Sequence, residues 1–160
     1  MTPKSLLRHP RAVSRIDDFS RGTFQEVIDD DAAVEKARRV IFCSGKIYYQ
    51  LLERRETLKA YDIAIVRVEQ FYPFPREKLE RIVGKYRKAD QWCWVQEGPV
   101  NMEGWSFMAP RLKEIVGTDP TYIGRPASAS PATGFANIYK QEQSLLPDKA
   151  VGQLSGVQTG

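Results

Sequence analysis

Histidine and cysteine are scarce in this chain, which leaves few groups for catalysis or metal binding. Among 160 residues there is one histidine, His9, and there are two cysteines, Cys43 and Cys93. His9 lies in a segment without strand or helix periodicity and has no apparent partner for acid–base chemistry, so we expect it to act in positioning or ion pairing. Each cysteine lies in an apolar run, away from any second ligand at metal-binding spacing, which predicts a buried core thiol. We expect no catalytic residue, cofactor ligand or metal ligand in this chain.

Long hydrophobic runs are also lacking. None approaches the roughly 20 residues that span a bilayer, and the start, Met1–Ser5, has no apolar stretch like that of a secretory signal. The basic residues are not interleaved with stacking aromatics, and the net charge is only +4, so nucleic acid is a poor fit. We expect a soluble, intracellular protein that binds neither membranes nor nucleic acid.

What is present indicates one globular domain with extensions. Apolar residues make up 42% of the chain and charged residues 28%, a composition typical of folded proteins. Residues 1–36 have little periodicity, and we expect them to dock in extended form on a surface. Residues 37–146 should form an α/β domain, and residues 147–160, rich in Gly, Ser and Gln, should form a flexible tail.

Short apolar runs alternate with helical periodicities through the central region. We expect strands at residues 40–43, 63–68, 91–96 and 121–123. We expect helices at about residues 47–58, 79–86, 105–115 and 135–146. Pro110 favours a break or a late start in the third helix. Strands that alternate with helices predict an α/β fold, with a mostly parallel sheet and helices on both faces.

The turn Ser44–Lys46 is a candidate anion site, because it joins the first expected strand to the first helix. Open α/β sheets bind ligands at the carboxyl ends of their strands. Backbone N–H groups at a helix start favour an anion, and Lys46 adds a full positive charge. The alternative is a plain turn in which Ser44 caps the helix and Gly45 supplies backbone freedom.

Arg76 and Lys78 open the second helix, where a bound phosphate would also meet free N–H groups. The alternative is a solvated helix face on which Glu77 and Glu80 pair with neighbouring bases.

The run of small residues at 124–134 carries a single charge, Arg125. Small side chains and prolines allow such a loop to pack tightly against another domain, whereas an exposed loop of this composition would be a linker.

Several separated segments resemble the carboxyl-terminal domain of 2-oxoglutarate dehydrogenase. This thiamine-diphosphate-dependent component decarboxylates 2-oxoglutarate and passes the succinyl group to a lipoyl carrier. The resemblance extends from Met1 to about Gln143. The segments that carry it are Met-Thr-Pro-Lys-Ser-Leu-Leu-Arg-His-Pro at 1–10, Cys-Ser-Gly-Lys-Ile-Tyr-Tyr at 43–49, Ala-Ile-Val-Arg-Val-Glu-Gln at 64–70, Trp-Val-Gln-Glu at 94–97 and Gly-Arg-Pro-Ala-Ser-Ala-Ser-Pro-Ala at 124–132.

This resemblance implies a transketolase carboxyl-terminal-like fold and a structural or regulatory part of an oxidoreductase of the tricarboxylic acid cycle. In that family the catalytic histidines and the thiamine diphosphate and magnesium ligands lie upstream of this domain. The implied partners are the thiamine-binding domains of the same enzyme, a second copy in a homodimer, and the lipoyl succinyltransferase core. The implied location is the cytoplasm in a bacterium and the mitochondrial matrix in a eukaryote.

The resemblance also implies a candidate effector site. In actinobacterial relatives this domain binds acetyl-CoA as an allosteric activator, through positions that correspond here to Arg76, Lys78 and Arg125. Glu77 and Pro126 stand where those relatives have arginines, which would weaken phosphate binding.

Two other functions remain open. One is a freestanding regulator that binds an acyl-CoA or nucleotide through Ser44, Lys46, Arg76 and Arg125. The other is the equivalent domain of a 2-oxoadipate dehydrogenase.

Overall fold

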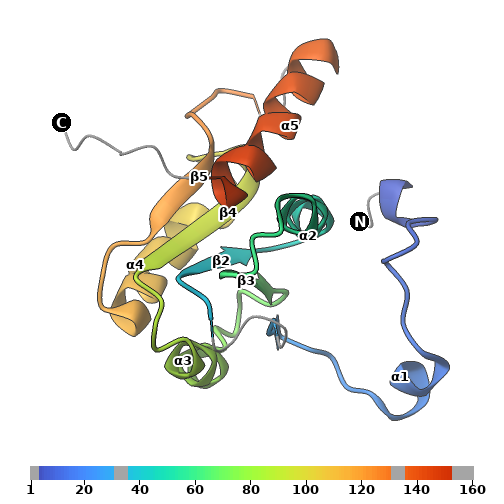
Figure 1. Cartoon of the computed structure of the whole chain (residues 1–160), viewed down its shortest axis with the longest axis vertical. Helices are drawn as coiled ribbons and strands as arrows, with labels where there is room; N and C mark the ends of the chain where they lie inside the picture. The colour runs from blue at the N-terminus through green and yellow to red at the C-terminus, as the bar shows by residue number, and fades with distance from the viewer. Residues whose placement is uncertain (1–3, 31–35, 131–135, 153–160) are drawn as a thin grey trace.

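The computed structural model describes residues 4–30, 36–130 and 136–152, with side chains throughout except at 136–142. Figure 1 shows the elements in chain order. They are η1 (Lys4–Leu6), α1 (Ile16–Arg21), β1 (Val27–Ile28), β2 (Arg39–Cys43), α2 (Ile47–Leu58), β3 (Ile63–Val68), α3 (Arg76–Lys85), β4 (Gln91–Pro99), α4 (Trp105–Val116), β5 (Thr121–Arg125) and α5 (Ala136–Val151).

The strands form one sheet in the order β1-β3-β2-β4-β5. The pairs β2–β3, β2–β4 and β4–β5 are parallel, which confirms the mostly parallel sheet. β1 is an antiparallel edge strand, with Val27 opposite Val68 and Ile28 opposite Arg67. The sequence did not predict this strand, because two residues are too few to show an alternating pattern.

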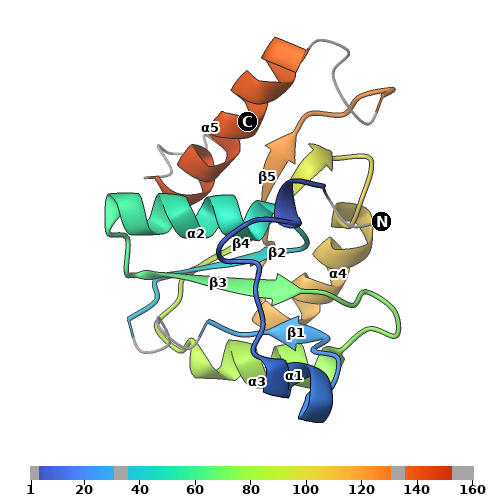
Figure 2. The same ribbon diagram turned by 90° about the vertical axis from the view of Figure 1, so that its right-hand side faces the viewer.

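Helices cover both faces of the sheet, as expected for an α/β fold (Figure 2). α2 and α5 cover one face, and α3 and α4 cover the other. The α2–α5 face is built from Ile41, Cys43, Ile47, Leu51, Ile63, Ile65, Cys93, Val95, Ile123, Leu146, Ala150 and Val151. The α3–α4 face is built from Val27, Ala37, Val40, Phe42, Ala64, Val66, Val68, Leu79, Ile82, Tyr86, Trp94, Met108 and Leu112.

Both cysteines are buried free thiols, which confirms their assignment to the core. Burial raises the pKa of the Cys93 thiol to about 11, and burial also raises the pKa of Cys43. Both thiols therefore stay protonated near neutral pH and behave as small apolar groups.

The expected tail from residue 147 was wrong for its first five residues. α5 continues through Pro147 to Val151, and Ala150 and Val151 are buried against the sheet. The Arg39 Nη1 donates to the carbonyl oxygens of Ala150 at 2.7 Å and Gly152 at 2.8 Å, which satisfies acceptors at the helix end. Tertiary burial thus outweighs the break that proline favours. Residues 153–160 lie outside the described part of the chain.

Two other boundaries differ from the expected ones. α4 begins at Trp105 and runs through Pro110 without a break, because the buried Met108 and Leu112 anchor it on either side of the exposed proline. β4 extends to Pro99, and its pairing with β5 shifts register between Val95 and Pro99.

Candidate functional site

The turn after β2 places Lys46 at the carboxyl end of the sheet. Gly45 has φ 73°, a left-handed conformation that favours glycine, as the plain-turn alternative expects. The cap position of α2 is Lys46 rather than Ser44, so the expected capping role of Ser44 is wrong. The Lys46 ammonium lies 2.5 Å from a carboxylate oxygen of Glu97 on β4. The turn therefore directs its positive charge toward the neighbouring strand.

A polar cluster of Lys46, Gln50, Glu97, Arg125 and Gln143 connects α2, β4, β5 and α5. Gln143 Nε2 donates to Glu97 Oε1 and, at 2.9 Å, to Gln50 Oε1. Arg125 Nη2 donates to Gln143 Oε1 at 3.3 Å. Arg125 and Gln143 are only 6% and 7% exposed. Two of the predicted residues, Lys46 and Arg125, are therefore brought to one place, where Gln143 and Glu97 link them.

This polar cluster has the chemistry of a binding site. It contains two cations and one carboxylate, so an anionic group would be attracted to it, and Lys46 could exchange Glu97 for that group. Amide side chains do not titrate, and the one carboxylate of the cluster, that of Glu97, is already paired with Lys46. The arrangement therefore suits recognition or the positioning of elements better than proton transfer.

The structure places Arg76 and Lys78 elsewhere, on α3 in the helix layer of the opposite face. Arg76 pairs with Glu80 at 3.4 Å and with Glu114 of α4. Lys78 pairs with Glu26. Both basic side chains remain nearly half exposed, as the solvated-face alternative expects. These two predicted residues therefore do not join the polar cluster.

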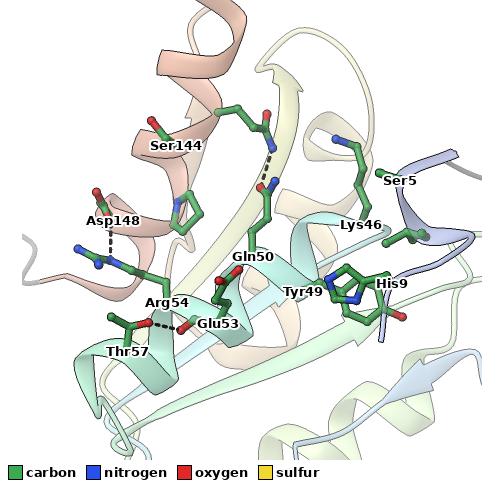
Figure 3. Close-up of a pocket in the computed structure, with 13 residues that line it drawn as sticks. Ser5, His9, Lys46, Tyr49, Gln50, Glu53, Arg54, Thr57, Ser144 and Asp148 are labelled. Carbon is green, nitrogen blue, oxygen red and sulfur yellow. Dashed lines mark hydrogen bonds and ion pairs between the residues drawn. The ribbon is translucent and has the colours of Figure 1, made fainter. Parts of the chain in front are cut away.

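A groove of about 780 Å³ lies beside the polar cluster, between η1, α2 and α5. Lys46, Gln50 and Gln143 belong to both the groove and the cluster, and farther along α2 Arg54 Nε lies 2.5 Å from Asp148 of α5. Figure 3 shows these charged and amide side chains arranged along the groove. The remaining lining residues are Ser5, Leu6, His9, Tyr49, Glu53, Thr57, Ser144 and Pro147. Most of the residues that line the groove thus carry a polar or charged group.

His9 forms part of the groove wall. Its ring centroid lies 4.8 Å from that of Tyr49, and its Nδ1 accepts the Arg11 backbone N–H at 3.2 Å. The ring contact places His9 against α2, which is consistent with the positioning role expected of this residue.

Sequence reasoning missed Glu97, Gln143 and Gln50. Glu97 follows the buried run of β4 as Lys46 follows that of β2, and this shared position at strand ends was a usable signal. Gln143 is 46 residues away from Glu97, and no local pattern relates the two. Only the packing of α5 onto α2 brings them together.

Two kinds of feature are absent from the described residues. No group of three or more His, Cys, Asp or Glu side chains at residues 4–30, 36–130 and 136–152 could hold a metal ion. Over the same ranges, no helix has the length and apolar character needed to cross a membrane.

Comparison with known proteins gives a consistent family match. The family model described as "2-oxoglutarate dehydrogenase C-terminal" matches residues 13–151. The 2-oxoglutarate dehydrogenase E1 component of Haemophilus influenzae is 41% identical over 155 residues, which are 94% of this chain and 17% of that protein. The protein of the same name from Cupriavidus necator is 41% identical over 160 residues, 98% of this chain and 17% of its own length.

A relative with a different name has the same percentage identity to this chain. The 2-oxoadipate dehydrogenase complex component E1 of Xenopus laevis is 41% identical over 154 residues, 94% of this chain and 17% of that protein. The chain thus spans about one sixth of the length of the curated relatives it matches.

Proposed function

Because the chain belongs to the 2-oxoglutarate dehydrogenase C-terminal family, we propose that it is the carboxyl-terminal domain of a 2-oxoglutarate dehydrogenase E1 polypeptide. The observation that carries this proposal is the family match over residues 13–151, together with relatives named as E1 components. The full-length enzyme would oxidatively decarboxylate 2-oxoglutarate with thiamine diphosphate and magnesium, and it would succinylate the lipoyl carrier of the tricarboxylic acid cycle complex.

Within that enzyme the domain has a structural and regulatory role. It supports the thiamine-binding domains, contributes to a homodimer, and belongs to an assembly with the lipoyl succinyltransferase core. The two-faced sheet and its paired surface charges suit a scaffold, and the polar cluster suits binding rather than proton transfer. The enzyme would be cytoplasmic in a bacterium and would lie in the mitochondrial matrix of a eukaryote.

Parallel activity assays of two proteins test whether catalysis requires the part of the enzyme outside this domain. The 160-residue chain, supplied with thiamine diphosphate, magnesium, 2-oxoglutarate and an artificial electron acceptor, should give no turnover. The full-length polypeptide under the same conditions should decarboxylate the substrate. Turnover by the short chain alone would overturn the assignment, as would a full-length protein inactive on every 2-oxoacid.

The substrate is a separate question, because relatives named for 2-oxoglutarate and for 2-oxoadipate are equally identical to this chain. We propose 2-oxoglutarate. The ratio of kcat/KM for the two substrates, measured on the full-length enzyme, tests this choice of substrate. A ratio that favours 2-oxoadipate would make 2-oxoadipate the substrate instead. A reading frame without preceding thiamine-binding domains would instead favour the freestanding acyl-CoA or nucleotide regulator.

We also propose an anionic effector site, with acetyl-CoA as the candidate ligand. The polar cluster supports placing it at Lys46 and Arg125, while the carboxylate partners of Arg76 and Lys78 weaken the case for α3. In isothermal titration, Lys46→Gln should weaken binding and Lys78→Gln should leave it unchanged. Lys113→Gln, which removes an exposed pair with Asp119, is the control. If titration of acetyl-CoA into the unmodified protein gives no saturable heat, the proposed effector site is wrong.

A further inference from the structure

The amino-terminal arm, defined here as residues 4–24, exposes an unusual concentration of large apolar side chains. Those that are most exposed are Leu7, Val13, Ile16, Phe19 and Phe24, which are 67% to 86% accessible. Ile16 and Phe19 are three residues apart on α1, so they lie on the same side of that helix. A single exposed leucine is ordinary, but five such side chains within 18 residues form an apolar surface that requires an explanation.

The body of the domain does not cover this surface. Figure 1 shows the arm, in blue, along one side of the molecule, and in Figure 2, where that side faces the viewer, it passes in front of β3. Its ties to the body include an ion pair between Arg11 and Glu56 at 2.5 Å and the ring contact between His9 and Tyr49. Exposed pairs of this kind contribute little to stability, because water and salt screen them. Contacts this weak would not offset the entropy of ordering an arm of this length.

The length of the relatives indicates what covers the arm. The match to the Cupriavidus necator protein includes 98% of this chain, so the arm lies within the sequence shared with E1 components. About five sixths of that relative lies outside the matched region. A polypeptide of that size would offer a large surface to which the arm is covalently tethered, and tethering raises its effective concentration far above that of a separate partner.

The charge of the arm defines the chemistry of the covering surface. The arm carries the basic residues Lys4, Arg8, Arg11, Arg15 and Arg21 and the acidic residues Asp17 and Asp18. Asp18 accepts the backbone N–H of Arg15 at 2.8 Å, which caps α1. A second copy of this chain, with its own net charge of +4, would present an excess of the same sign, whereas an apolar groove edged by carboxylates is complementary.

We propose that the arm docks in an apolar, carboxylate-edged groove on the remainder of the same E1 polypeptide. Leu7, Val13, Ile16, Phe19 and Phe24 supply its buried contacts, and the arm fixes this domain against the thiamine-binding part. The inference rests on the proposed function, because it requires that the longer polypeptide exists.

Hydrogen exchange of the full-length polypeptide tests the proposal. Amides of residues 7–24 should exchange at least tenfold more slowly in the full-length protein than in the 160-residue chain. The double variant Ile16→Asp, Phe19→Asp should abolish that protection in the full-length protein. It should not change the unfolding of the short chain, where both side chains are exposed. The matched control is Ser14→Asp, Ser20→Asp, which adds the same charge at polar positions of the arm and should preserve most of the protection.

The outcomes separate the two proposals. A full-length protein that turns over 2-oxoglutarate but exchanges the arm as fast as the short chain does would overturn the docking inference and leave the proposed function intact. Protection that appears in the short chain and rises with its concentration would make a second copy the occupant and would equally overturn it. A full-length protein inactive on every 2-oxoacid would instead count against the proposed function.

Discussion

Asp30 connects the segment after β1 to the centre of the domain. Its carboxylate pairs with Arg55 of α2 and accepts the backbone N–H of Ile65 at 2.9 Å. Arg55 in turn donates to the carbonyl oxygen of Ile63 at 3.1 Å. The side chains of Asp30 and Arg55 are 9% and 11% exposed. The pair thus joins a helix, a strand and the preceding segment in a place that water hardly reaches.

Asp30→Asn should therefore be strongly destabilising. The substitution keeps the volume and one acceptor oxygen, but it leaves the buried guanidinium of Arg55 without its countercharge, which typically costs about 3–5 kcal/mol. Urea unfolding followed by circular dichroism measures this loss. Asp90→Asn is the control, because its pair with Arg38 is more than half exposed and should contribute less than about 1 kcal/mol. Equal losses for the two variants would show that burial does not govern the Asp30 pair.

The candidate site shows at the same scale what sequence can predict. Lys46 could be identified because it is a charged residue beside a strand end, where the α/β pattern itself indicates ligand binding. Arg125 was a candidate through the family resemblance. The sequence could not separate these two residues from Arg76 and Lys78. That separation depends on which helix covers which face of the sheet, and the residue pattern does not encode how the chain crosses between the faces. Gln143 is found only from contacts between α5 and the rest of the domain.

At the scale of elements, the end of α5 belongs to the core. Ala150 is fully buried and Lys149, its neighbour, is exposed. Ala150→Asp should lower the free energy of unfolding by more than about 3 kcal/mol, because it buries a carboxylate against apolar strand residues. Lys149→Asp, with the same new side chain on the solvent face, should change it by about 0.5 kcal/mol or less. Chemical denaturation compares the two. A tolerated Ala150→Asp would mean that residues 147–151 do not pack as α5 shows.

The strands and helices that the sequence predicted share one property, a periodic pattern long enough to be read. β2, β3 and α2 all show it. β1 could not be recognised, because its two residues gain their strand conformation from pairing with Val68 and Arg67. The end of α5 was missed because the Gly, Ser and Gln content of residues 147–160 predicts a flexible tail. Its helical conformation is stabilised by the burial of Ala150 and by the bonds from Arg39 to the last carbonyls, both of which are long-range effects.

At the scale of the whole molecule, buried and partly buried weak acids lie on both faces of the sheet. Cys43 and Cys93 belong to the α2–α5 side, while Tyr86 and Tyr122 pack on the α3–α4 side. Burial is the main cause that raises the pKa of Cys93 to about 11 and that of Tyr122 to about 12. Burial followed by a hydrogen bond to Asp29 raises the pKa of Tyr86. In each case the folded state holds its proton to higher pH than the unfolded chain does.

Stability should consequently fall on the alkaline side. Below about pH 9, the ordinary thiol value, both states are protonated and the contribution of Cys93 is fully present. Above it the unfolded thiol ionises first, so the unfolded state binds fewer protons and the free energy of unfolding decreases until the pH passes the folded value near 11. Urea unfolding from pH 7 to 11 should show this decline. Because the thiol contributes up to about 1.4 kcal/mol per pH unit, Cys93→Ala should flatten the curve between pH 9 and 11. Tyr61→Phe, at an exposed tyrosine, should leave its shape unchanged, and a curve that rises with pH would contradict the assignment of these groups as buried neutral acids.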